Sequence, residues 1–132
     1  MPYGNLLTDV VQSSVTGTPP QFNDGAGTQT GTLCRAWVNF AGASGTRNAS
    51  FNVSSVTRNG TGDYTVNFTN ALSDANYSAV FTGGFSSAVN HYTYPAISNS
   101  SAPSTTTLRI YNALPFSPWI NDSVYICVSI FR

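Results

Sequence analysis

The sequence predicts an all-β protein, and more specifically an antiparallel β-sandwich. Three observations favour this fold class. Ser, Thr and Asn number 17, 16 and 13 in 132 residues, and together with Tyr, Phe and Val they are typical of strands and turns. Apolar side chains alternate with a period of two in several segments, as half-buried strands require. A helical period of 3.6 residues is not sustained over any useful length.

The charge of the chain is small and balanced. The charged residues are five Arg and five Asp, Lys and Glu are absent, and the formal net charge is zero. Nucleic acids and anionic membrane surfaces are bound through basic patches, so we expect no nucleic-acid partner. No apolar run approaches the roughly 20 residues of a membrane-spanning helix, so we also expect no membrane insertion.

The composition changes near residue 30, which predicts an N-terminal arm followed by one compact domain. Residues 1–30 are rich in Gly, Pro and Thr and contain one apolar patch at residues 6–11, which indicates an extended arm. These apolar groups are too few for a core of their own, so we expect the patch to pack against another chain. Residues 31–132 carry the alternating patterns and are predicted to form a β-sandwich knob domain.

The first part of the domain predicts three strands and one hairpin. Residues 34–40 and 51–57 have strand patterns, with an apolar face in the first. Asn59-Gly60-Thr61-Gly62 predicts a hairpin turn, because Asn-Gly tolerates the positive φ angles that such turns need. Residues 64–68 alternate again and complete the hairpin.

The second part of the domain is predicted to end in a long apolar strand. The elements in order are a strand at residues 77–81 ended by Gly83-Gly84, an irregular segment at residues 85–104, a strand at residues 105–111, a loop at residues 112–119 and a strand at residues 124–131. Both faces of the last strand are mostly apolar, so it should be central in a sheet or lie in a subunit interface. The side chains expected to be buried, in the core or between subunits, are Trp37, Phe40, Val53, Tyr64, Val66, Phe68, Phe81, Ile110, Ile126 and Val128.

The residues that could carry catalysis are few. The five Asp are isolated in the sequence, and Asp63 and Asp74 stand in turn contexts, so a glycosidase pair of carboxylates is not indicated. His91 is the single imidazole, and Cys34 and Cys127 lie within strands, so neither a nucleophilic dyad nor a metal-ligand spacing is present. We therefore expect a protein that is not an enzyme, with no catalytic or metal-ligating residues and no cofactor.

The two cysteines are expected to be free, buried thiols, because a free Cys packs as a small hydrophobe. The first five residues lack the basic and apolar regions of a secretory signal, so we expect synthesis in a reducing cytoplasm. A disulfide between Cys34 and Cys127 is possible but is not implied by their spacing.

Aromatic side chains in the irregular segments indicate binding. Loops carry function more often than the strands that they connect, and exposed rings beside Asn or Asp side chains suit sugars. We predict binding through loops at one end of the sandwich, in residues 83–104 and 112–122. The alternative is that these rings pack over the ends of the sandwich or between subunits. The candidate binding residues are His91, Tyr92, Tyr94, Phe116 and Trp119.

Several stretches also form a recognisable series of motifs. They are Gly31-Thr32-Leu33-Cys34-Arg35-Ala36-Trp37-Val38-Asn39-Phe40, residues 51–68, Ala71-Leu72-Ser73-Asp74-Ala75-Asn76-Tyr77 and the closing residues 124–132. Together with Gly17-Thr18-Pro19-Pro20-Gln21-Phe22, this series resembles the C-terminal domains of phage tail-fibre proteins, notably those from viruses of cyanobacteria and other aquatic bacteria. The resemblance covers about residues 17–132.

The resemblance implies a virion protein, made in the host cytoplasm, that forms a homotrimer on the phage surface and binds a host receptor. That receptor is expected to be a surface glycan. The apolar strand at residues 124–131 and the neutral charge also favour self-association. No catalytic residue belongs to the motifs.

A different place on the virion is the main alternative. A tail fibre carries a long shaft ahead of such a domain, whereas Met1 lies only about 16 residues before the resemblance begins. The chain could therefore be a capsid decoration or cement protein, or a head fibre. Its residues 1–30 would then attach the knob to other virion proteins. A glycan-cleaving enzyme is the third hypothesis, which the lack of paired carboxylates disfavours.

Overall fold

The computed structural model contains only β-strands as regular secondary structure among the residues that it describes. The described residues are 21–23, 28–30, 33–86, 91–114 and 119–132. The chain divides into two compact units, Met1–Leu33 and Cys34–Arg132. The all-β prediction is confirmed for the described part of the chain.

The first unit contains a small antiparallel ladder. Strand β1 (Gln21–Asn23) pairs with β2 (Thr28–Thr30), with Gln21 opposite Thr30. The sequence predicted an extended arm and no strand here, since three-residue strands are too short to show an alternating pattern. The apolar patch at residues 6–11 lies outside the described residues.

The second unit, which we call the domain, begins with a four-stranded antiparallel sheet in the order β4-β3-β10-β7. Its strands are β3 (Cys34–Phe40), β4 (Arg47–Phe51), β7 (Ser78–Gly83) and β10 (Ile126–Phe131). The prediction that the closing strand is central is confirmed, because β10 pairs with β3 on one side and β7 on the other. It starts at Ile126 rather than at residue 124.

The second sheet of the domain is also antiparallel, in the order β5-β6-β9-β8. Its strands are β5 (Val53–Gly60), β6 (Asp63–Phe68), β8 (Tyr94–Ile97) and β9 (Thr107–Ala113). The predicted hairpin is confirmed as β5–β6, but its turn is shorter than expected. Gly60 already pairs with Asp63, and the positive φ of +65° falls on Gly62 rather than on Asn59 or Gly60.

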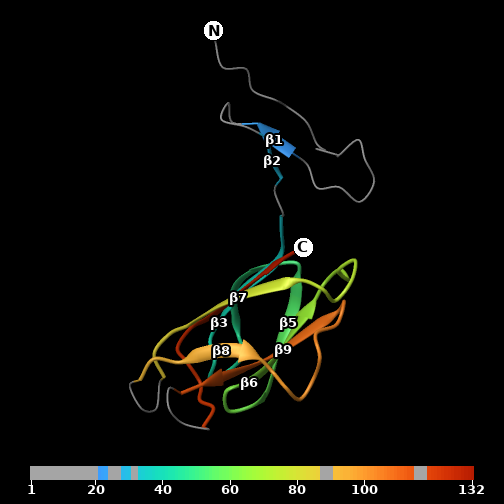
Figure 1. The fold of residues 1–132 in the computed structure, drawn as a ribbon. Helices are drawn as coiled ribbons and strands as arrows, with labels where there is room; N and C mark the ends of the chain where they lie inside the picture. The colour runs from blue at the N-terminus through green and yellow to red at the C-terminus, as the bar shows by residue number, and fades with distance from the viewer. Residues whose placement is uncertain (1–20, 24–27, 31–32, 87–90, 115–118) are drawn as a thin grey trace. The chain divides into compact units, whose positions relative to one another are not determined.

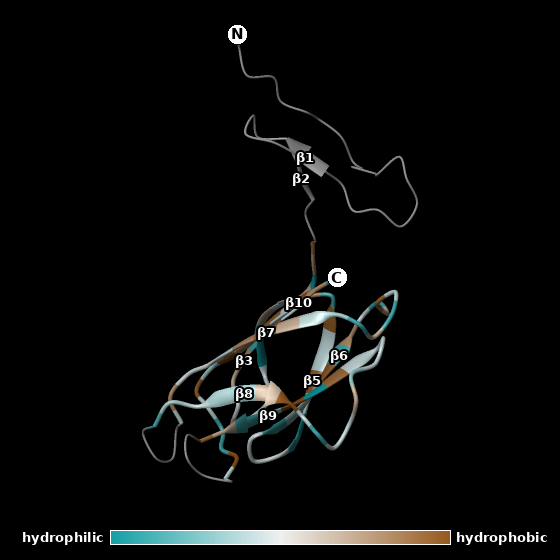
Figure 2. Cartoon of the chain, viewed as in Figure 1, coloured by the Kyte–Doolittle hydropathy of each residue, from teal (hydrophilic) through white to brown (hydrophobic). Residues whose placement is uncertain are grey.

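The two sheets share a single core (Figure 1). Its buried apolar side chains come from β3 and β10 of one sheet and from β5, β6 and β9 of the other. The ring of Phe40 meets the ring of Tyr64 edge-on across the core, with centroids 5.1 Å apart. In Figure 2 strongly hydrophilic colour appears only in short stretches of the domain. The core consists of Ala36, Val38, Phe40, Val53, Tyr64, Val66, Phe68, Leu72, Leu108, Ile110, Ile126, Val128 and Ile130.

Most of the predicted core is confirmed, with two differences. Phe81 is only partly buried against the core. Trp37 is 38% exposed, so its predicted burial does not hold within this chain. The physical reason is the alternation of the strand: Ala36, Val38 and Phe40 point inward, so Trp37 points outward whatever its size.

The strand registers give the domain two distinct ends. The connections β3–β4, β5–β6, β7–β8 and β9–β10 lie at one end, which we call the loop end. The connections β4–β5, β6–β7 and β8–β9 lie at the other, together with Cys34 and Arg132, and we call it the terminus end. Figure 1 shows the C-terminus at this end of the domain.

Candidate functional site

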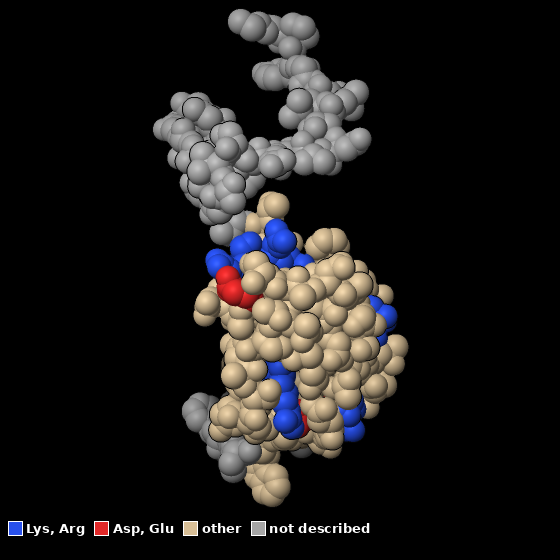
Figure 3. Space-filling model, turned by 90° about the vertical axis from the view of Figure 1, so that its right-hand side faces the viewer, with Lys and Arg blue, Asp and Glu red and all other residues tan. Residues whose placement is uncertain are grey.

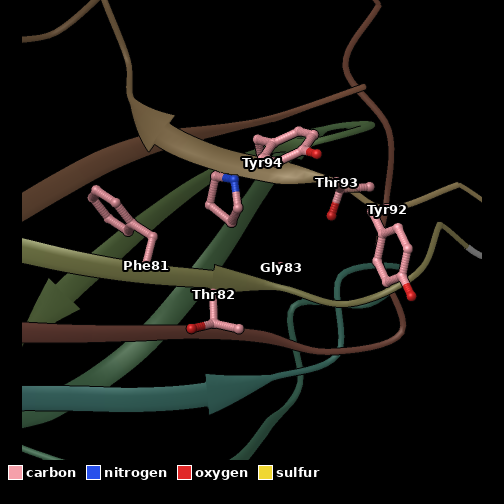
Figure 4. A pocket seen from close by; sticks show the side chains of 7 residues that line it. Phe81, Thr82, Gly83, Tyr92, Thr93 and Tyr94 are labelled. Carbon is pink, nitrogen blue, oxygen red and sulfur yellow. The ribbon is translucent and has the colours of Figure 1, made fainter. Parts of the chain in front are cut away.

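A groove of about 360 Å³ opens where the edge of one sheet approaches the edge of the other. Strand β7 is the last strand of its sheet and β8 is the last strand of the second sheet. The groove lies between them at the loop end, and Figure 4 shows Phe81 and Tyr92 toward its opposite ends. Its lining residues are Phe81, Thr82, Gly83, Tyr92, Thr93, Tyr94 and Pro95.

The close approach of the two edges depends on Gly83. A Cβ atom at this position would lie 2.5 Å from Oγ1 of Thr93, 2.7 Å from its carbonyl oxygen and 2.8 Å from Cδ of Pro95. Two of these neighbours cannot move aside as the end of a flexible side chain could. Only glycine therefore fits at this position without widening the groove.

Aromatic rings stand exposed around the groove. Tyr92 is 63% exposed and Tyr94 is 59% exposed. Phe85 packs against Tyr92, with ring centroids 4.3 Å apart and a tilt of 53°. The three rings lie next to one another along the chain fold, and a contiguous group of exposed apolar side chains is a candidate contact surface.

Four of the five predicted binding residues lie at the loop end. His91, Tyr92 and Tyr94 belong to the β7–β8 connection and the start of β8. Trp119, 72% exposed, belongs to the β9–β10 connection. The N–H of Leu114 donates to the carbonyl of Trp119. Leu114 follows Ala113, which pairs with Tyr94, so this bond holds Trp119 near the start of β8. Phe116 lies outside the described residues.

The structure divides the predicted binding segments. The described parts of one group, residues 83–86, 91–95, 112–114 and 119–122, come together at the loop end. Residues 98–104 lie at the terminus end, where the N–H of Ser98 donates to the carbonyl of Arg109 and the N–H of Leu72 donates to the carbonyl of Thr105. The sequence assigned Phe81 to the core, and it placed Gly83 and Pro95 within a binding segment without singling them out as binding residues. No local pattern distinguishes these three positions, because the groove exists only where β7 and β8 meet.

A buried carboxylate lies beneath the loop end. Asp122, which is 9% exposed, accepts hydrogen bonds from Nη2 of Arg58 at 2.6 Å, the N–H of Gly62 at 2.9 Å and the hydroxyl of Tyr64 at 2.5 Å. Burial alone would raise the pKa of Asp122, but the bonds from Arg58, Tyr64 and Gly62 outweigh it and lower that pKa. Burial, together with the bond to Asp122, raises the pKa of Tyr64 well above its ordinary value. At neutral pH Asp122 is therefore the ionised acceptor and Tyr64 the protonated donor of this hydrogen bond.

A second set of buried polar groups joins Ser123, which follows Asp122 in the chain, to the groove. The hydroxyls of Ser123 and Thr93 hydrogen-bond to each other, and Nδ2 of Asn112 donates to Oγ of Ser123 at 2.8 Å. The Thr93 hydroxyl also donates to the carbonyl of Gly84 at 2.9 Å. Thr93 is only 3% exposed although it lines the groove. The floor of the groove is thus fixed by hydrogen bonds from the domain interior.

The charges of the described chain are largely paired. Arg58 binds Asp122, Arg109 binds Asp63 at 2.6 Å, and Arg132 binds Asp74. The hydrogen bonds from Arg109 lower the pKa of Asp63, and those from Arg132 lower that of Asp74. Figure 3 shows a face that is mostly uncharged, with its acidic atoms beside basic ones. No Asp or Arg lines the groove.

Within the described residues, the side chains that could bind a metal ion or form a disulfide are kept apart. Within them, no three His, Cys, Asp or Glu side chains gather closely enough to hold a metal ion. Cys34 and Cys127 are free and half-buried. They lie opposite Phe131 and Asn39 respectively, which puts them about 15 Å apart along the sheet at roughly 3.3 Å per residue. This separation excludes a disulfide between them within one chain.

Comparison with protein-family models finds no match for this chain, and neither curated proteins nor solved structures match it. The resemblance to tail-fibre domains therefore stays a prediction from the sequence. In the part of the chain that the structure describes, there is no helix of the length and apolar character needed to cross a membrane.

Proposed function

We propose that this chain is a phage virion surface protein of the tail-fibre-tip type, whose knob binds a receptor on the host surface. The observation that carries the proposal is the groove with its exposed Tyr92 and Tyr94 at the loop end. The domain begins and ends at the opposite end, with Cys34 beside Phe131. A displayed binding module needs this polarity, because its contact surface must face away from its attachment.

Binding rather than catalysis is the role that the carboxylates favour. A glycosidase needs a carboxylic acid with a raised pKa beside a second carboxylate. Asp63, Asp74 and Asp122 instead each bond to an arginine, and all three have a lowered pKa. We infer that the protein holds its receptor without cleaving it.

The finer description as a β-sandwich knob in a homotrimer also belongs to this proposal. Two four-stranded sheets that share one core are the layers that a sandwich requires. The two outer faces differ in character. On one, Phe51, Trp37 and Val80 form a cross-strand row with Ser129 between the last two, and they are 55%, 38% and 56% exposed.

The outer face of the other sheet is polar by comparison. Nδ2 of Asn67 donates to Oγ of Ser55 at 2.9 Å and to Oγ1 of Thr57 at 3.1 Å, so its side chains bond among themselves. We therefore assign the subunit contact to the Phe51–Trp37–Val80 row. Light scattering of the native chain should give three times the mass of one chain. The measured mass should fall in Trp37→Thr, and it should be unchanged in Thr57→Ser. A monomeric mass for the native chain would contradict the homotrimer.

The experiment that tests the virion assignment is localisation. Antibodies against the domain should label the tail tips of phage particles from the source culture. Labelling over the capsid would instead favour a decoration, cement or head-fibre role in which residues 1–30 contact other virion proteins. The absence of label from every particle would contradict a virion role.

Receptor binding is tested with the labelled protein on intact bacterial cells. The double variant Tyr92→Ala, Tyr94→Ala should lose cell binding and remain folded, because both side chains are exposed. The matched control is Ile97→Ser, which changes an apolar side chain on the same strand, 44% exposed, at the terminus end. Equal loss in both variants would show that the loop end is not the recognition surface.

A further inference from the structure

We propose that the groove between β7 and β8 binds an uncharged polysaccharide, with sugar rings stacked on Tyr92 and Tyr94. The inference rests on the proposed function, receptor binding by the loop end, and it names the chemical class of the receptor. Three properties of the groove carry it: its exposed rings, the uncharged hydrogen-bonding groups along its largely apolar walls and its lack of charged side chains.

The rings provide the apolar part of the contact. Tyr92 and Tyr94 are each more than half exposed and flank Thr93 on the same short segment. The apolar body and polar tip of a tyrosine suit a ligand that is itself apolar on one side and wet on the other. The C–H face of a pyranose ring with its rim of hydroxyls is such a ligand.

The walls provide hydrogen-bonding groups without charge. Both β7 and β8 are edge strands, so backbone N–H and C=O groups on their outer sides have no ladder partner. Thr82 lies along the β7 edge of the groove, but Figure 4 shows its side chain pointing away from Tyr94, so the β7 wall offers backbone groups rather than a side-chain hydroxyl. Sugar hydroxyls both donate and accept hydrogen bonds, so they can use either kind of backbone group.

A peptide strand fits the same groove less well. Strand addition to a sheet requires an edge with regularly spaced N–H donors. Strand β8 has four residues, and the second is Pro95, which has no N–H. The opposite edge is occupied near Gly83, where Thr93 and Pro95 approach within contact distance. The groove therefore favours a saccharide over an added β-strand.

The charge distribution decides between neutral and acidic saccharides. No Arg or Asp lines the groove, and the nearest ion pairs at the loop end, Arg58–Asp122 and Arg109–Asp63, are closed on themselves. Among the residues that line the groove, a uronate or sulfate group would find no cationic side chain to replace its hydration. An uncharged sugar has no such group to desolvate.

The groove is small and preformed. Its volume of about 360 Å³ lies at the lower end of the roughly 300–1,000 Å³ of small-molecule sites, which suits one or two sugar residues of a longer chain. Thr93 is held in place by Ser123 and Gly84, so little ordering accompanies binding. We expect weak binding at each site, strengthened by several sites on one particle.

The experiment is a titration of the full chain with defined polysaccharides, in which binding is measured by calorimetry and by saturation-transfer NMR. The neutral probes are dextran, mannan and galactan, and the acidic probes are alginate and polygalacturonate. At least one neutral probe should bind, with an affinity that changes less than about twofold between low salt and roughly 0.5 M salt. Tyr92→Ala should weaken it roughly tenfold, as the loss of a stacking contact does, and Ile97→Ser should not.

A second variant tests the charge argument independently of the tyrosines. Thr82→Arg places a long cationic side chain at the exposed β7 edge beside the groove, so it should create binding of alginate that disappears at high salt. Preferential, salt-sensitive binding of the acidic probes by the native chain would overturn the proposal. Binding of an extended Val-Thr peptide in place of the sugars would also overturn it.

The outcomes also separate this inference from the function on which it rests. If intact cells bind the chain through Tyr92 and Tyr94 but no neutral probe does, the receptor class is wrong and receptor binding by the loop end stands. If neither cells nor polysaccharides bind, both proposals fail.

Discussion

The two ends of the domain are closed in different ways. At the loop end, residues 121–123 insert between the other connections. The carboxylate of Asp122 accepts from Arg58 and Gly62, and the carbonyl of Ser123 accepts from the N–H of Gly42 at 2.9 Å. At the terminus end, the connections are joined through backbone groups and exposed amides: the N–H of Leu72 donates to the carbonyl of Thr105 at 2.8 Å, and Nδ2 of Asn52 donates to the carbonyl of Arg35 at 3.0 Å.

The ion pairs show the same contrast. Asp122 is nearly buried and bonded to partners 58 to 64 residues away in sequence. Asp74 pairs with Arg132 at the surface, with side chains that are 35% and 44% exposed. The Arg58–Asp122 pair of the loop end therefore reaches into the interior, whereas the Arg132–Asp74 pair of the terminus end lies at the surface. A rigid base beneath the connecting loops is what a preformed binding groove requires.

The largest effect is expected from Asp122→Asn. An asparagine keeps one acceptor oxygen but turns amide hydrogens toward the N–H groups of Arg58 and Gly62, which can only donate, and it leaves the guanidinium of Arg58 without its charge partner. We expect a loss of about 3 kcal/mol in the free energy of unfolding, measured by urea denaturation. A loss below about 1 kcal/mol would mean that the loop end does not depend on this carboxylate.

Two neighbouring glycines sharpen the contrast at the hairpin turn. Gly62 has φ +65°, and a Cβ there would lie 2.5 Å from the N atom of Asn121. Gly62→Ala should therefore cost about 2 kcal/mol or more, from the left-handed backbone and the contact together. A Cβ at Gly60 would meet no atom within 4 Å, so Gly60→Ala should stay within about 0.5 kcal/mol of the native chain. Equal thermal melting of the two variants would contradict the tight insertion of residues 121–123.

The fold was predictable wherever a strand has one clean apolar face. Strands β3 and β6 alternate and were predicted nearly in place, and β10 was predicted from its long apolar run, which is apolar on both faces. Strand β4 was missed because it is an edge strand that is mostly exposed, so its sequence shows no alternation. Strand β8 was missed because Pro95 argues against a strand, although an edge position tolerates it.

The candidate site was predictable only in its rings. Tyr92, Tyr94 and Trp119 are large aromatic side chains in segments without strand pattern, which is a local signal. The groove and its base are not local, because Gly83 gains its role from Thr93, near the edge of the other sheet, and Asp122 gains its role from Arg58, which lies 64 residues earlier. A sequence read by period and composition has no access to such pairings.

Acid should destabilise the domain through its buried carboxylates. The folded pKa values of Asp122 and Asp63 lie below their ordinary values, so both contribute stability at neutral pH that is lost as the pH falls below about 4 and through the folded values. Each unit of pKa difference corresponds to about 1.4 kcal/mol. Denaturation by urea should show constant stability from these groups between about pH 5 and 8 and a decline below. The decline should be shallower in Asp63→Asn, and an unchanged slope would contradict the role of the Arg109–Asp63 pair.

The smallest effect is expected at the terminus end, from Asp74→Asn. The Arg132–Asp74 pair is exposed, so solvent and salt screen it and its loss changes stability little. Oδ1 of Asp74 also accepts from the N–H of Asn76 at 2.7 Å, and an asparagine keeps that acceptor in the turn. Melting of Asp74→Asn should therefore differ from the native chain only at low ionic strength, and much less than melting of Asp122→Asn does. A loss as large as that of Asp122→Asn, or one that persists in high salt, would mean that the terminus end is as strongly cross-linked as the loop end.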